Sequence, residues 1–143
     1  MPRIRLSAEL DRRIRESARH RCGYCLSPQH LVMARLTIEH IIPLVEGGSN
    51  EEDNLWLSCS LCNSHKADKV TAIDPPTGER VPLFNPRFEV WAEHFRWTED
   101  GLQIEGLTPT GRATALALHL NDDPIRLEVR RHWVRAGWHP PTD

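Results

Sequence analysis

Four cysteines stand in two pairs with the same internal spacing, and together they offer ligands for one metal ion. Cys22 and Cys25 form the first pair, and Cys59 and Cys62 form the second. Thiolates in two such pairs are typical of a closed, tetrahedral structural zinc site. The alternative is a pair of disulfides, which a reducing cytosol disfavours. The sequence therefore predicts one structural Zn2+ with no open position for chemistry.

The interval between the two pairs is longer than in a small zinc ribbon, and it holds side chains suited to phosphodiester hydrolysis. His40 is the candidate general base, because imidazole titrates near neutrality. Glu39 and Asn63 offer oxygen ligands for a catalytic Mg2+ or Mn2+ ion. Neighbouring side chains on a flat strand point to opposite faces, so a shared site requires a bend near Pro43.

Three further polar residues accompany this group. Asn54 could hold the loop or orient the imidazole, although alone it reads as a turn residue, as does Asn50. Lys66 follows Asn63 by one turn near a helix N-terminus, where it could bind a phosphate. His65 is an alternative metal ligand, but on a helix it points away from Asn63.

These motifs resemble the HNH endonuclease family in its four-cysteine, stand-alone bacterial form. The resemblance covers roughly residues 20–70 and rests on Cys22-x2-Cys25, Glu39-His40-Ile41-Ile42-Pro43, Gly47-Gly48, Asn54-Leu55 and Cys59-x2-Cys62-Asn63-x2-Lys66. This chain has Glu39 where many members have aspartate, and Asn63 where many have histidine.

The resemblance implies a ββα-metal (His-Me finger) fold with His40 as general base. It implies that Glu39 and Asn63 bind one catalytic divalent ion, and that Asn54 positions the loop that holds His40. The implied reaction is hydrolysis of a DNA phosphodiester, which leaves a 5′-phosphate and a 3′-hydroxyl.

The elements that must position these residues belong to an α+β fold. Ser7 is the expected N-cap of the first helix, which precedes the first cysteine pair. Hydrophobic spacing predicts a helix over 8–21, strands over 29–33, over 36–42 and from 54 or 55 onward, and a helix over 63–70.

The C-terminal half carries fewer chemical signals and more structural ones. Prolines predict an extended connection over 71–87, residues 88–97 suit helix or strand, and Asp100-Gly101 predicts a hairpin. Two helices are predicted over 110–120 and 124–136, the second between Asp123 as N-cap and Gly137. The faces expected to be buried are Ala113, Leu116, Ala117 and Leu120 on the first helix, and Ile125, Val129, Trp133 and Ala136 on the second.

Length and charge limit the remaining possibilities. With 143 residues and a net charge of -2, we expect a single domain over 1–143, with an N-terminal helix in 1–21, the core in 22–70 and an extension in 71–143. Arginines gather near the N-terminus and again at Arg126, Arg130, Arg131 and Arg135, where they could contact phosphates or form solvated helix faces. No apolar run reaches membrane-spanning length, and no secretory signal is present, which predicts a soluble cytoplasmic protein without a membrane partner.

The leading hypothesis is therefore a metal-dependent endonuclease acting on double-stranded or branched DNA. One alternative is a zinc-dependent nucleic-acid-binding module without catalysis, which the cysteines and arginines would also fit. Another is a purely structural zinc protein.

Overall fold

The computed structural model describes residues 6–142 and has helices and short antiparallel strands, which confirms the α+β class. Its contacts divide the chain into two compact units. The N-terminal unit contains Met1–Val70 and Asn85–Phe88, and the C-terminal unit contains Thr71–Phe84 and Glu89–Asp143. The single domain stays a prediction. No helix within the described residues is long and apolar enough to cross a membrane.

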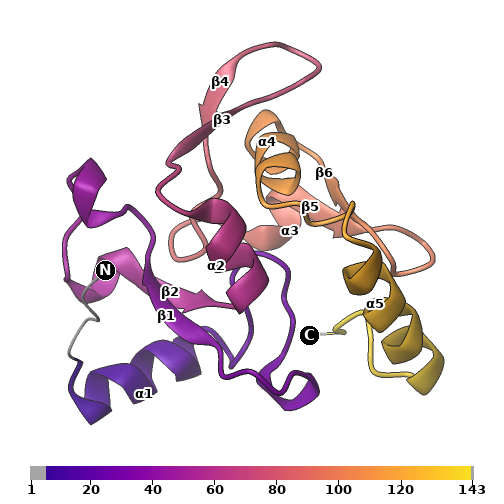
Figure 1. Cartoon of the computed structure of the whole chain (residues 1–143), viewed down its shortest axis with the longest axis horizontal. Helices are drawn as coiled ribbons and strands as arrows, with labels where there is room; N and C mark the ends of the chain where they lie inside the picture. Colours follow the sequence, from indigo (N-terminus) through magenta and orange to yellow (C-terminus); the bar gives the residue numbers. More distant parts are fainter. Residues whose placement is uncertain (1–5, 143) are drawn as a thin grey trace. The chain divides into compact units, whose positions relative to one another are not determined.

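The N-terminal unit is built around a two-stranded hairpin between two helices (Figure 1). Its elements are α1 (Ala8–Ser17), the 3-10 turns η1 (Gln29–Leu31), η2 (Leu44–Glu46) and η3 (Glu52–Asn54), strands β1 (Thr37–His40) and β2 (Leu55–Ser58), and α2 (Ser60–Lys66). The strands are antiparallel, with Thr37 opposite Ser58 and His40 opposite Leu55. Aliphatic side chains on alternate positions give the hairpin one buried face. There Leu57 packs with Leu36 and with Ala18, which follows α1.

Three expectations for this unit are corrected. The first helix stops at Ser17 because Arg19 and His20 adopt positive φ angles of 55° and 56°. The His20 N–H then donates to the Arg15 carbonyl and the Arg19 N–H to the Glu16 carbonyl, which is a Schellman ending without its usual glycine. Residues 29–31 form a 3-10 turn in place of the expected strand.

The helix expected over 63–70 begins earlier and ends earlier. The Cys59 thiol caps it by accepting the Cys62 N–H at 3.4 Å, so the second cysteine knuckle forms the N-cap and the first turn of the helix. It ends at Lys66 because Ala67 has a positive φ of 48°. Helical geometry therefore fixes the positions of Cys62 and Asn63 together.

Residues 85–88 belong to the N-terminal unit although the residues on both sides belong to the other. The Arg87 guanidinium donates to the Leu55 carbonyl at 2.9 and 3.2 Å and lies over the Trp56 ring, 4.9 Å from its centre. This contact holds the segment against β2.

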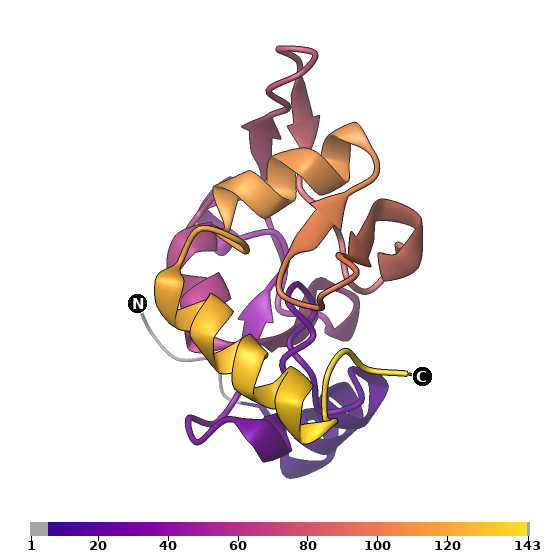
Figure 2. The ribbon, with the colours of Figure 1, turned by 90° about the vertical axis from the view of Figure 1, so that its right-hand side faces the viewer.

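The C-terminal unit combines two small hairpins with three helices, and its two longest helices are orange and yellow in Figure 2. Its elements are β3 (Thr71–Ile73), β4 (Arg80–Pro82), α3 (Trp91–His94), β5 (Phe95–Trp97), β6 (Ile104–Gly106), α4 (Pro109–Ala117) and α5 (Pro124–Ala136). The Asp100-Gly101 hairpin joins β5 to β6, and Asp123 and Gly137 bound α5, as predicted. The ambiguous stretch 88–97 contains both a helical turn and a strand.

Two other expectations for this unit are wrong. The connection over 71–87 contains the hairpin β3–β4, which the prolines concealed. On α5 the expected face is right only at Trp133, because Ile125 is 70% and Val129 37% exposed, and the other buried side chains are Arg126 and Arg130. Arg130 is accommodated because it donates to the carbonyls of Leu102 and Leu120, both at 2.8 Å. The helix expected over 110–120 is α4, which ends at Ala117, so Leu120 lies beyond it. Ala113 and Leu120 are buried as expected, but Leu116 is exposed.

Candidate active site

The four cysteines converge as their spacing predicts. Cys22 and Cys25 lie in the turn after α1, Cys59 caps α2, and Cys62 lies in its first turn. Their sulfur atoms all lie within 4.8 Å of one another. The Cys25 and Cys59 sulfurs are 3.7 Å apart, close to the edge of about 3.8 Å of a tetrahedron with zinc–sulfur bonds of ~2.3 Å. The cluster is compatible with a structural zinc.

The electrostatics of the thiols suit an interior metal site. Burial raises the pKa of Cys22 and of Cys62 well above the ordinary thiol value. A metal ion binds the deprotonated thiolates, so binding in this cluster would release protons. The negative charge that these sulfurs would carry is then shared with the metal.

Glu39 and His40 are the last two residues of strand β1. Glu39 is buried at 7% exposure, and His40, the last residue of the strand, is half-buried. A bend at Ile41 and Ile42 follows at once, just before Pro43. The bend that a shared site requires is therefore present where the strand ends.

The loop after β1 is closed by the Asn54 side chain. Its amide donates to the carbonyls of Ile42 and Ser49 at 2.9 and 2.8 Å, and its oxygen accepts the Ile42 N–H at 2.9 Å. Gly48 lies so close to this junction that a Cβ there would be 1.8 Å from the Ile42 carbonyl oxygen. Of the two roles considered for Asn54, its contacts are those of a residue that holds the loop.

The imidazole has a different partner. The Nε2 atom of His40 lies 2.7 Å from Oδ1 of Asn50, which stands on the closed loop. From the sequence alone, Asn50 is predicted only as a turn residue. Its contact with His40 depends on how the loop folds back, which no local pattern reveals.

Glu39, His40 and Asn63 line one groove in the N-terminal unit, with a volume of about 670 Å3. Asn63 is exposed there, one residue after the sulfur ligand Cys62. Neither Lys66 nor His65 is among the described residues that line this groove. The structure thus brings together three of the predicted catalytic residues.

Glu39 carries an uncommitted oxygen. Its Oε1 atom is buried and has no hydrogen-bond partner among the described residues. Burial raises the pKa of Glu39, while the charge of Lys66 and the nearby Tyr24 hydroxyl act against that rise. A buried carboxylate oxygen without a donor costs free energy unless a cation or a proton satisfies it.

Lys66, the predicted phosphate ligand, is only 2% exposed. Its ammonium donates to the Ile41 carbonyl at 2.8 Å and, more weakly, to the His40 carbonyl at 3.4 Å. Burial lowers the pKa of Lys66, and the charge of Glu39 opposes that change. The contacts of this side chain hold the junction between β1 and its loop from inside.

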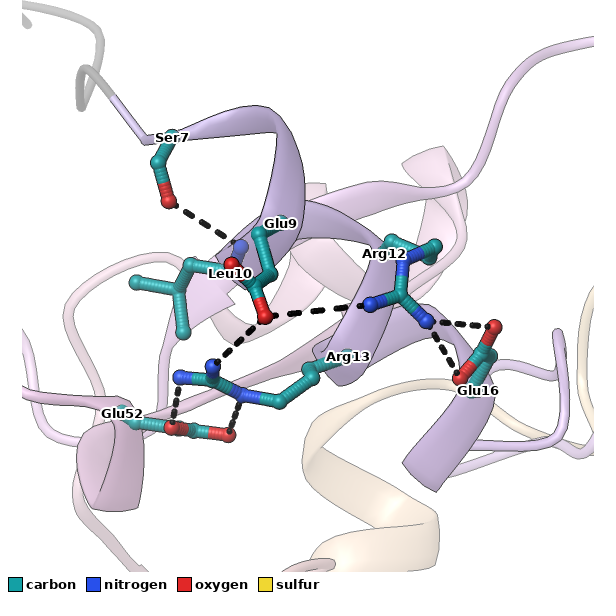
Figure 3. Close-up of polar contacts among 7 residues, drawn as sticks. All are labelled: Ser7, Glu9, Leu10, Arg12, Arg13, Glu16 and Glu52. Atoms are coloured by element: carbon teal, nitrogen blue, oxygen red, sulfur yellow. Dashed lines mark hydrogen bonds and ion pairs between the residues drawn. The ribbon is translucent and has the colours of Figure 1, made fainter.

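The arginine clusters are largely engaged within the protein. On α1, Figure 3 shows Arg12 between Glu9 and Glu16, and Arg13 paired with Glu9 and Glu52. In the C-terminal cluster, Arg126 and Arg130 are buried. Arg3 and Arg5 lie outside the described residues. Among the arginines that the structure describes, neither cluster is therefore an unopposed basic surface, and the interpretation as solvated or structural arginines fits these contacts better.

Comparison with known proteins adds one match. A family model described as HNH endonuclease matches residues 22–69, a span that begins at Cys22 and includes Glu39, His40 and Asn63. Searches of curated proteins and of solved structures found no match. Residues 22–69 of this chain therefore form an HNH endonuclease domain, in which four cysteines are positioned to make a metal site.

Proposed function

We propose that this domain hydrolyses phosphodiester bonds in double-stranded or branched DNA, with His40 as general base and one divalent cation as cofactor. The observation that carries the proposal is the common groove lined by Glu39, His40 and Asn63. Activation of a water requires a base, and a hard cation requires oxygen ligands. These three side chains supply both in one place.

The contact between His40 and Asn50 supports a specific direction of proton transfer. An amide oxygen only accepts hydrogen bonds, so Nε2 of His40 donates to it, and in the neutral imidazole that a general base requires Nδ1 keeps the lone pair. Nδ1 then takes a proton from the attacking water. The water oxygen bonds to phosphorus, the bond from phosphorus to the 3′-oxygen breaks, and that oxygen acquires a proton from solvent. The products are a 5′-phosphate and a 3′-hydroxyl.

Glu39 and Asn63 would hold the catalytic Mg2+ or Mn2+. The buried Oε1 atom of Glu39, with no donor among the described residues, fits a cation ligand. Bound there, the ion supplies neutralisation of charge on the phosphate and the leaving oxygen. Asn54 contributes indirectly, because it holds the loop on which Asn50 stands.

The four cysteines would hold a structural Zn2+ at the base of the same hairpin. With all four ligand positions occupied by thiolates, such an ion stabilises the fold and takes no part in hydrolysis. Two metals with separate roles follow from this assignment, and they should respond to different reagents.

Cleavage of supercoiled plasmid tests the proposal. Zinc-loaded protein should nick or linearise the DNA when Mg2+ or Mn2+ is added and not when it is omitted. His40→Ala should lower the rate by about 10²- to 10⁴-fold, the usual contribution of a general base. His30→Ala, which removes an exposed histidine outside the groove, is the matched control and should cleave normally.

The outcomes separate the hypotheses. Wild-type protein that leaves the plasmid intact with both metals, or a His40→Ala variant as active as wild type, contradicts the proposal. Salt-sensitive binding without cleavage would favour the non-catalytic nucleic-acid-binding module. Nicks that DNA ligase reseals would confirm the expected 5′-phosphate and 3′-hydroxyl ends.

A further inference from the structure

We propose that Arg35 binds a backbone phosphate of the DNA in the groove of His40. This inference rests on the proposed function and names the cation that meets the substrate. Arg35 is exposed and lines the groove together with Glu39, His40 and Asn63. Nothing in its local sequence singles it out.

The charges around the groove show why a cation is needed. Carboxylates and guanidinium groups both line it, and they are Asp11, Glu39, Asp68, Arg15 and Arg35. A phosphodiester carries a negative charge, which the carboxylates repel. Even with a divalent ion on Glu39, an anionic strand gains from a further positive charge at the groove.

Arg15 is already committed. Its Nε donates to Asp11 at 2.7 Å and its Nη1 donates to the Leu36 carbonyl at 2.7 Å. Its side chain is only 14% exposed. Lys66 is buried and bound to loop carbonyls, as described above. Neither of these cations is available to a phosphate without breaking internal contacts.

Arg35 is in the opposite situation. Within residues 6–142, no hydrogen bond or ion pair engages its guanidinium. The backbone on both sides is nevertheless fixed, because the Gln29 amide donates to the Ala34 carbonyl at 3.1 Å and its oxygen accepts the Leu36 N–H at 2.8 Å. Leu36 itself is buried in the core.

A free side chain on an anchored backbone is a favourable arrangement for binding. The guanidinium presents donors in a planar fork that matches two phosphate oxygens. Because the backbone around Arg35 is already ordered, only the side chain has to be immobilised when DNA binds, which lowers the entropic cost.

Binding measurements on a cleavage-silent protein test Arg35 directly. A fluorescent DNA duplex is titrated with His40→Ala protein, alone and combined with Arg35→Ala, Arg35→Lys or Arg12→Ala, over a range of salt concentrations. Arg12 is the matched control, since it is exposed on α1, paired with glutamates and outside the groove. Circular dichroism checks that each variant is folded.

Arg35→Ala should weaken binding by about tenfold and lower the slope of log K against log salt by about 0.9, the loss of one phosphate contact. Arg35→Lys should keep the slope, because it keeps the charge, and should recover part of the affinity. Arg12→Ala should change neither quantity. In protein that retains His40, the same Arg35 variants should reduce plasmid cleavage mainly by raising KM.

If Arg35→Ala behaves as Arg12→Ala does while the wild-type protein binds and cleaves DNA, Arg35 is not the phosphate ligand and the nuclease proposal stands. Wild-type protein that neither binds nor cleaves overturns both. Loss of affinity in Arg35→Ala with an unchanged salt slope would also contradict a phosphate contact.

Discussion

The pairing of His40 with Asn50 is the contact at residue scale on which the proposed chemistry depends most. Cys22, Cys25 and His40 could be found from residue type and spacing alone, because metal coordination and base catalysis restrict which side chains serve. Asn50 and Arg35 could not, since asparagine is common in turns and a lone arginine is common on surfaces. Their proposed roles rest on a loop closure for Asn50 and, for Arg35, on the absence of an internal partner within residues 6–142.

Asn50→Ala should slow DNA cleavage by about tenfold, because a hydrogen bond between neutral groups contributes about 1 kcal/mol and ~1.4 kcal/mol corresponds to a tenfold change in rate. Asn50→Asp keeps an accepting oxygen and should lose less activity than the alanine variant. Cleavage rates on plasmid, with thermal unfolding to confirm folding, give the comparison. Equal losses in both variants would argue against the hydrogen bond as the cause.

At the scale of elements, the ends and buried faces of the helices show what could be predicted from the sequence. Caps at Ser7 and Asp123 were readable because a side chain next to a helix has one obvious partner. The early end of α1 was not, since an arginine occupies the place of the usual glycine. The buried face of α5 was also missed, because hydrophobic periodicity assigns arginines to the solvent side.

Substitutions at Gly47 and Gly48, which are neighbours in the loop after β1, distinguish the effect of steric overlap from that of backbone strain. Gly48→Ala places a Cβ against the Ile42 carbonyl and near the Asn54 amide, so the loop should open. Gly47 has a φ of +88° with nothing within 4 Å, so Gly47→Ala costs only the strain of about 1–2 kcal/mol. Urea unfolding of the zinc-loaded protein should show a larger loss for Gly48→Ala, which should also abolish cleavage. A smaller loss at Gly48 than at Gly47 would contradict this view of the loop.

At the scale of the whole molecule, the cysteine site joins the turn after α1 to the start of α2. Metal binding in small zinc peptides contributes on the order of 10 kcal/mol, comparable with the total stability of many domains. A zinc ion bound by these cysteines would therefore decide whether the N-terminal unit folds, whereas the His40 side chain should not. The ligands were predictable from sequence, but the division into two units was not, because it depends on contacts between distant segments.

Removal of zinc with a chelator, or Cys59→Ser, should lower the melting temperature sharply and abolish cleavage, while His40→Ala should melt as wild type does. Differential scanning calorimetry makes the comparison and counts the transitions. One transition that shifts as a whole would agree with the predicted single domain. Two transitions, of which only one responds to the chelator, would mean that the two units unfold independently.

Residues 85–88 belong to the N-terminal unit, and this affects where the chain can be truncated. A fragment that stops at Val70 would keep every cysteine and every proposed catalytic residue. It would still lose Arg87, and with it the donors to the Leu55 carbonyl and the cover over the Trp56 ring. The smallest portion of this protein that retains these contacts of the β1–β2 hairpin therefore extends to Phe88, well past the last residue of the family match.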